Sequence, residues 1–186
     1  PAEFKSCSKR ENSLLKLLCY GLLLICCSTS AQAFRVERLN QGEPIISKRD
    51  FALLGVGEDG GNINGPSVIR VPDWIPLEER ADPQARYYMY FAHHKGSYIR
   101  MAWAPRVEGP WQLYQADATV PDGRRGVLDM GVTRELPLGN GLTIIKHIAS
   151  PEVHVDDESK RIIMYFHGPV EYEGQLKGMQ KTFVAT

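Results

Sequence analysis

Cysteine, net charge and long apolar runs are what this sequence has least of. All four cysteines lie in the first 27 residues, so the rest of the chain cannot form a disulfide, a cysteine-based zinc site or a thiol nucleophile; they are Cys7, Cys19, Cys26 and Cys27. The 22 basic and 22 acidic residues give a formal net charge of +0, which leaves no basic surface for nucleic acid. No His-x-x-x-His or His-Glu-x-x-His spacing occurs, and no Gly-Lys-Ser/Thr follows the glycines at 55–61, so helical zinc motifs and a phosphate loop are excluded.

The start of the chain predicts export. The apolar run Leu17–Cys27 has 11 residues, whereas a membrane-spanning helix takes ~20. Four basic residues precede this run, and Ala31-Gln-Ala33 follows it. This is the pattern of a secretory signal peptide over residues 1–33, with a signal anchor as the alternative. We therefore expect a secreted protein, extracellular or periplasmic, that leaves the membrane after cleavage. The sequence begins with Pro1 and has no Met before Met89, which fits a truncated start or translated upstream residues.

A β-rich segment follows, from Asn62 to Tyr114. Four short runs rich in Val, Ile, Tyr and Trp are separated by Gly, Pro and Asp. Between Ser97 and Ala104 the side chains alternate with period two, with Ile99, Met101 and Trp103 on one face and Tyr98, Arg100 and Ala102 on the other. The pattern predicts a four-stranded antiparallel meander, and strands of an ordinary β-sandwich fit it equally well.

The order of these features recurs later in the chain. Gly65-Pro-Ser-Val-Ile69 matches Ser150-Pro-Glu-Val-His154, and Tyr88-Met-Tyr-Phe91 matches Ile163-Met-Tyr-Phe166. The two prolines are 85 residues apart and the two methionines 75 residues apart. A recurring four-stranded unit is typical of a β-propeller blade. We expect one blade at about 62–115, a second, truncated blade at about 142–186, and a long connection between them at 116–140, all within one domain at 34–186.

These motifs, together with Arg100-Met-Ala-Trp-Ala104 and Glu108-Gly-Pro-Trp111, resemble the first two blades of the five-bladed propeller glycoside hydrolases, family 43 and its relatives. The resemblance covers roughly residues 62–186. It implies an all-β fold, a five-bladed propeller in the full protein, and cleavage of glycosidic bonds in poly- or oligosaccharides. Because an open ring leaves unpaired strand edges, we expect an N-terminal fragment of a longer protein, inactive alone.

Polar residues gather at one end of the predicted blades. Antiparallel pairing places the start of the first strand, the end of the second and the start of the third at the same end. Expected there as sugar-binding residues are Asn62, Asn64, His93, His147, His154 and His167, although polar residues are also ordinary on a solvated rim. Trp74, in a loop, is a further sugar-stacking candidate, whereas Trp103 and Trp111 are expected in the core.

The catalytic groups are predicted from the resemblance. Glycoside hydrolysis usually needs two carboxyl groups. The family implies a base Asp in an Asp-Pro pair, where this chain has Gly65-Pro66, and an acidic residue near the sugar, where it has Glu152. Related family 117 propellers are thought to use a histidine as acid, so His93, His94, His147 or His167 could serve, with His94 as the second catalytic candidate beside Glu152.

The missing base leaves alternatives open. Asp59 or a residue of later blades could replace it, or the protein could be a non-catalytic carbohydrate-binding propeller or a scaffold propeller. A carbohydrate is the expected partner, with no nucleic acid. No cofactor is required, and the spacing indicates no metal site, but the resemblance allows a structural calcium ion in the central channel.

Overall fold

The computed structural model describes residues 36–38, 40–47, 62–93, 96–114, 126–139, 141–173 and 175–186. The chain divides into two compact units, and nearly all of the first, Pro1–Glu37, lies outside these ranges. The predicted signal peptide therefore stays a prediction. In the ranges described, no helical segment has the length and apolar character needed to cross a membrane.

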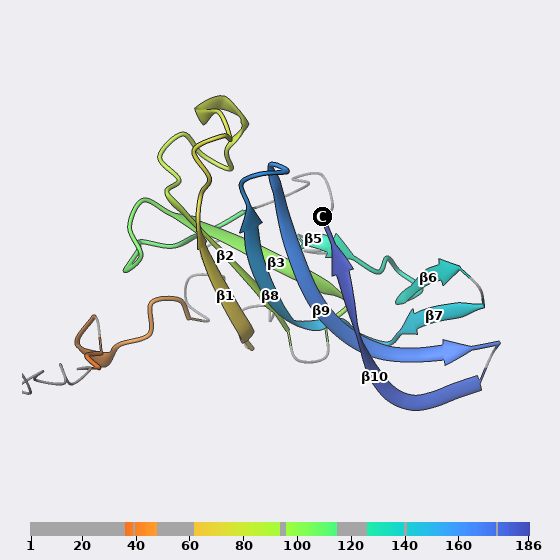
Figure 1. Cartoon of the computed structure of the whole chain (residues 1–186). Coiled ribbons are helices and arrows are strands. Elements are labelled where there is room, and N and C mark those ends of the chain that lie inside the picture. Colours follow the sequence, from red (N-terminus) through yellow and green to blue (C-terminus); the bar gives the residue numbers. More distant parts are fainter. Residues whose placement is uncertain are drawn as a thin grey trace, which may run out of the picture. The chain divides into compact units, whose positions relative to one another are not determined.

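The second unit is all-β, with two antiparallel sheets (Figure 1). The first sheet has the order β1 (Asn64–Arg70), β2 (Tyr87–Ala92), β3 (Tyr98–Ala104) and β4 (Gln112–Leu113), and β5 (Gly126–Asp129) also pairs with β3. The second has the order β10 (Gln175–Ala185), β9 (Arg161–Tyr172), β7 (Leu142–Ile145) and β6 (Glu135–Gly139), and β8 (Ala149–Asp156) also pairs with β9. Two short 3-10 turns are η1 (Asn40–Gly42) and η3 (Leu77–Glu79).

The predicted meander is confirmed as β1 to β4, paired in chain order. The predicted connection at 116–140 contains two strands that the sequence pattern did not indicate, β5 and β6. β5 pairs with the first half of β3, beyond the part that β4 covers, and β6 forms a hairpin with β7. Pro137 lies within β6, and β6 is the last strand of its sheet, a position where a missing backbone N–H is tolerated.

The second sheet departs from a simple meander. The 12-residue strand β9 pairs with β8 along its first half and with β7 along its end. β10 runs along its other edge, and Figure 1 shows β6 and β7 beside the far end of this long β9–β10 hairpin. The segment 142–148 belongs to the predicted second blade at about 142–186 and precedes the strand that begins at Ala149. It forms the separate strand β7, because the free edge of β9 offers it hydrogen-bond partners.

The internal repeat is present in the strand registers. The pairing of β1 with β2 shifts between Asn64 and Ser67, and that of β8 with β9 shifts between Ala149 and Glu152. Each shift marks a β-bulge, and corresponding residues of the two bulges are 85 positions apart. Ser67 and Glu152 are therefore equivalent residues, each the first to pair after its bulge.

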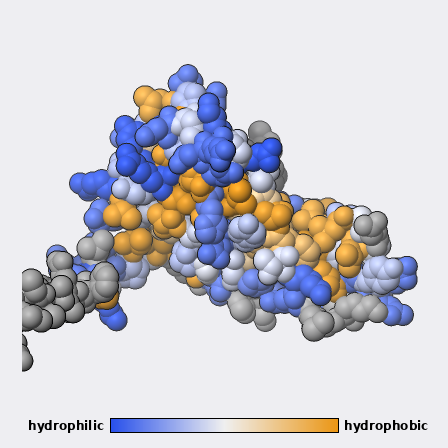
Figure 2. All heavy atoms as spheres, viewed as in Figure 1, coloured by the Kyte–Doolittle hydropathy of each residue, from blue (hydrophilic) through white to orange (hydrophobic). Residues whose placement is uncertain are grey.

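Both faces of β3 are buried. Ile99, Met101 and Trp103 pack between the two sheets with Met164 and Phe166 of β9. The other face packs into a smaller cluster around Met89, Phe91 and Trp111. The alternation of side chains along β3 was predicted correctly, and so was the burial of Trp103 and Trp111. Figure 2 shows a hydrophobic band across the middle of the molecule with hydrophilic side chains above it.

The second face of β3 also buries a charge. Arg100 is only 1% exposed, and its guanidinium carbon lies 4.7 Å from the centroid of the Phe91 ring, a cation–π contact. Its Nη2 donates a hydrogen bond of 2.8 Å to the backbone carbonyl of Asn62, just before β1. A buried arginine therefore fixes the chain where it enters the first sheet.

The first strands of the two repeats, β1 and β8, lie side by side. Ser150 Oγ donates to Asn64 Oδ1 at 3.1 Å near their starts, and the Val153 N–H donates to Ser67 Oγ at 2.9 Å midway. Beyond their ends, Trp74 Nε1 donates to Asp157 Oδ1 at 2.9 Å. The three contacts occur in the same order along both strands, so β1 and β8 run parallel.

The Ser67 hydroxyl should contribute measurably to the contact between the sheets. Ser67→Ala leaves the buried Val153 N–H without its acceptor, and we expect the free energy of unfolding to fall by about 1–2 kcal/mol. Ser67→Thr keeps the hydroxyl and suits a strand, so it serves as the control. Urea denaturation of the three proteins measures the effect, and equal stability of the two variants would contradict it.

Candidate functional site

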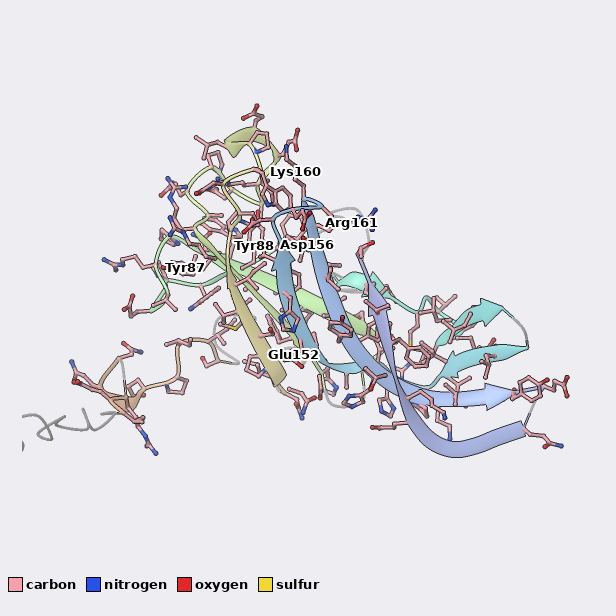
Figure 3. All side chains as sticks on the ribbon, viewed as in Figure 1. Tyr87, Tyr88, Glu152, Asp156, Lys160 and Arg161 are labelled. Atoms are coloured by element: carbon pink, nitrogen blue, oxygen red, sulfur yellow. The ribbon has the colours of Figure 1, made fainter. Side chains whose placement is uncertain are left out.

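The predicted catalytic carboxylate lies on the outer face of β8. Val153 faces the core, so Glu152 and His154 project from the opposite face. Their Oε1 and Nε2 atoms are 3.5 Å apart, with side chains 73% and 55% exposed respectively. Tyr165, opposite Glu152 on β9, places its ring edge-on to the His154 imidazole with centroids 5.9 Å apart. Figure 3 shows Glu152 toward the lower end of β8 and Asp156 at the upper end; Glu152, His154 and Tyr165 are called the Glu152 cluster below.

Strained backbone lies next to this cluster. Gly65 and Ser150, equivalent residues in the two bulges, both have positive φ, +55° and +49°. For Ser150 this conformation is costly, and such strain tends to occur at functional sites, as β-bulges do. The two bulges touch, because a Cβ added to Gly65 would lie 2.7 Å from the Cα of Ser150. Glu152 therefore lies two residues after Ser150, which is in a strained and tightly packed bulge.

The same contact explains the absence of the expected base. An aspartate at position 65 would need both the left-handed conformation and a movement of the Ser150 backbone. Position 65 thus contributes a close backbone approach, and it offers no room for the carboxylate that the resemblance implies. Any second carboxyl group must come from another part of the protein.

The structure places the other predicted residues around the same end of the sheets. His93 follows β2, and His147 and Ile148 precede β8, where the Ile148 N–H donates to the carbonyl of Gly96 at 3.1 Å. His147 Nε2 lies 3.3 Å from Gln180 Nε2, and His167 pairs with Ala149 and Thr182. The turn after β2 and the segment before β8 are therefore in contact. Asn62 is exposed just before β1, whereas His94 and Asp59 lie outside the described residues.

Trp74 lies at the opposite end of β1 and β8 from Glu152. It follows β1, and its indole N–H bonds to Asp157, which follows β8. The two residues line a cleft of about 430 Å³, together with residues 70–73 and Val155; we call it the Trp74 cleft. Sequence reasoning had no means of finding Asp157, because it is 83 residues from Trp74 and belongs to an ordinary turn.

The turn after β8 is held by Asp156. The carboxylate accepts hydrogen bonds from the Ser159 hydroxyl and from the Ser159 and Glu158 N–H groups. These hydrogen bonds hold the pKa of Asp156 below its usual value, and the bond from the Ser159 hydroxyl has the largest effect. Tyr90 lies between the sheets, where burial raises its pKa far above the ordinary value, so it stays protonated.

Metal ligands do not converge in the part of the chain that the structure describes. No group of three or more His, Cys, Asp or Glu side chains comes together there in a way that could hold a metal ion. The calcium ion that the resemblance allows in the central channel therefore stays a prediction.

Comparisons with known proteins give distant likenesses. No protein-family model matches the chain. An uncharacterised protein, R118, of Acanthamoeba polyphaga mimivirus is 29% identical over 111 residues, which are 57% of this chain and 28% of that protein. The crystal structure of a thermostable family-43 glycoside hydrolase is similar over 66% of this chain and 31% of that one, with a TM-score of 0.40 and 19% identity. The chain spans about a third or less of both proteins, and neither likeness assigns it a family or an activity.

Two glycines with positive φ allow the bulge contact to be tested. Gly131 has φ +74° and open space around its Cβ position, so Gly131→Ala should cost only the backbone strain, about 1–2 kcal/mol. Gly65→Ala adds the clash with Ser150, and we expect a loss of at least about 2–4 kcal/mol. Chemical denaturation compares the two variants. Equal losses would mean that the bulges are free to move apart.

The turn at Asp156 predicts a pH dependence. In Ser159→Ala the pKa of Asp156 should rise toward 3.8, its usual value, which NMR titration of the carboxyl carbon measures directly. Because the folded-state pKa is depressed, the stabilisation is complete above the unfolded value and is lost as the pH falls through the folded one. The parent protein should therefore be more stable than the variant at pH 7, with a difference that shrinks below about pH 4. A difference that does not change with pH would contradict this.

Proposed function

We propose that this chain forms two neighbouring blades of a secreted, propeller-like protein that acts on carbohydrates, with the architecture of the glycoside hydrolases it resembles. The repeated units support this proposal, because their first strands run parallel and carry equivalent bulges at the same end. Radial repetition of one unit around a centre produces this arrangement. The signal-peptide pattern at residues 1–33 supports secretion.

The pair of Glu152 and His154 is the observation on which the proposed activity rests. Glu152 is accessible, lies beside the strained contact of Gly65 with Ser150, and has an imidazole 3.5 Å away. Carboxyl and imidazole side chains are both common general acids and bases. Glu152 would thus serve as one of the two acid–base groups of a glycosidase, with the His154 imidazole beside it.

The second acid–base group lies elsewhere in this proposal. The two carboxyl groups of a glycosidase stand about 5–5.5 Å apart in retaining enzymes and about 6.5–9.5 Å apart in inverting ones. Gly65 cannot supply one, so later blades or His94 would provide the partner. The hydrogen-bonding residues at this end would hold the sugar hydroxyls; they are Asn62, Asn64, His93, His147 and His167.

Carbohydrate binding without cleavage is the second candidate. The absence of the expected base at position 65 favours it, since the packing against Ser150 excludes a simple replacement. A carboxylate, an imidazole and the ring of Tyr165 within one cluster suit sugar hydroxyls and sugar faces even where no bond is broken.

Full-length protein carrying Glu152→Gln tests the proposed hydrolysis. Glu158→Gln is the matched control, because Glu158 is an exposed glutamate in the turn at the other end of β8. Rates are measured on aryl glycosides and on plant and algal oligosaccharides. We expect Glu152→Gln to lower the rate at least about 100-fold while Glu158→Gln leaves it unchanged.

The outcomes separate the two candidates. Cleavage that survives Glu152→Gln would exclude Glu152 as a catalytic group. Sugar binding without turnover, weakened by Glu152→Gln, would establish the binding protein instead. If the protein neither binds nor cleaves any tested sugar, both candidate functions are wrong.

A further inference from the structure

We propose that the Trp74 cleft is a second saccharide-binding site, separate from the Glu152 cluster and independent of whether that cluster is catalytic. It lies where β1 and β8 end, whereas the Glu152 cluster lies along the outer face of β8. On β8 the lining residue Val155 lies on the face opposite to Glu152 and His154, because side chains alternate along a strand. A ligand in the cleft would therefore leave the Glu152 cluster free.

The aromatic wall of the cleft is fixed in position. The indole N–H of Trp74 donates to Asp157 Oδ1 at 2.9 Å, so the ring is held against the second sheet. A half-buried ring held in this way loses little conformational entropy when a ligand stacks on it. The indole face offers the apolar, electron-rich surface on which the C–H groups of a sugar ring pack.

The remaining residues of the lining supply both hydrogen-bond donors and hydrogen-bond acceptors. Arg70 brings five N–H donors, and Asp73 brings carboxylate acceptors, while Val71, Pro72 and Val155 form the apolar part of the lining. A sugar needs this combination, because each hydroxyl both donates and accepts. Two aspartates against one arginine leave a formal charge of −1 in the lining, which disfavours anionic ligands. The chemistry thus fits a neutral saccharide better than a uronic acid or a phosphate.

The size of the cleft agrees with this ligand class. A volume of about 430 Å³ lies at the small end of the range usual for ligand pockets, about 300–1,000 Å³. The cleft is formed by both sheets, residues 70–74 from the first and Val155 and Asp157 from the second. A saccharide bound there would contact both repeats at once.

Intrinsic fluorescence tests binding directly. Trp103 and Trp111 are only 8% and 6% exposed, so the part of a sugar-induced change in emission that disappears in Trp74→Phe reports on Trp74. The probes are cellohexaose and laminarihexaose as neutral chains and an alginate hexamer as the anionic control. The full protein is used with Glu152→Gln, so that any turnover that depends on Glu152 is absent. We expect one neutral hexamer to shift the emission saturably and the alginate hexamer to have no effect.

Variants separate a binding site from a contact that only fastens the sheets together. Trp74→Ala should weaken binding at least about tenfold, and Trp74→Phe should retain part of it, because the ring face remains. Asp73→Asn should weaken binding severalfold while leaving the bond between Trp74 and Asp157 in place, with Glu78→Gln, exposed in η3, as the control. Titration calorimetry measures all four.

Two results would overturn the proposal. The first is that neither neutral hexamer changes the emission of the protein, whatever activity the Glu152 cluster has. The second is that Asp73→Asn binds as tightly as the parent while Trp74→Ala lowers only the midpoint of thermal unfolding, which would make Trp74 a purely structural residue.

Discussion

The contact between the bulges at Gly65 and Ser150 is the constraint on which the rest of the arrangement depends. Each bulge aims the residues that follow it, and the close backbone approach brings the two first strands together in parallel. From there the Ser67 hydroxyl reaches the Val153 N–H, and the faces behind these strands close over a shared apolar core. A glycine is needed at only one of the two positions, because Ser150 adopts the strained conformation itself.

This packing has a chemical consequence. The two repeats carry equivalent bulges at the same end, and the residue after each bulge is an equivalent position for a functional side chain. Only the second repeat has a carboxylate at this position. Glu152 stands where Ser67 stands in the first repeat, and Ser67 is occupied in joining the sheets. The first repeat thus contributes packing at this end, and the second contributes the accessible acid with its neighbouring imidazole.

Local pattern was enough to predict the strands with strong alternation and the repeat that relates them. The meander of β1 to β4 and the burial of Trp103 followed from period-two alternation and turn residues. β5 and β6 were missed because their short segments contain glycine or proline, and only the open edges of β3 and β7 make strands of them. Likewise, the contact of Trp74 with Asp157 depends on two sheets packing together, which no spacing along the chain records.

The two ends of β1 and β8 achieve rigidity by different means, and this bears on what each end can do. At the start, backbone strain fixes the position of Glu152. At the far end, the Asp156 carboxylate ties down the turn through the hydroxyl and N–H of Ser159 and the N–H of Glu158. That turn carries Asp157, so a restrained carboxylate holds the indole of Trp74. An ordinary exposed residue of a turn does not require such restraint. An aromatic side chain that stacks on a ligand binds that ligand more tightly when its ring is already held in place.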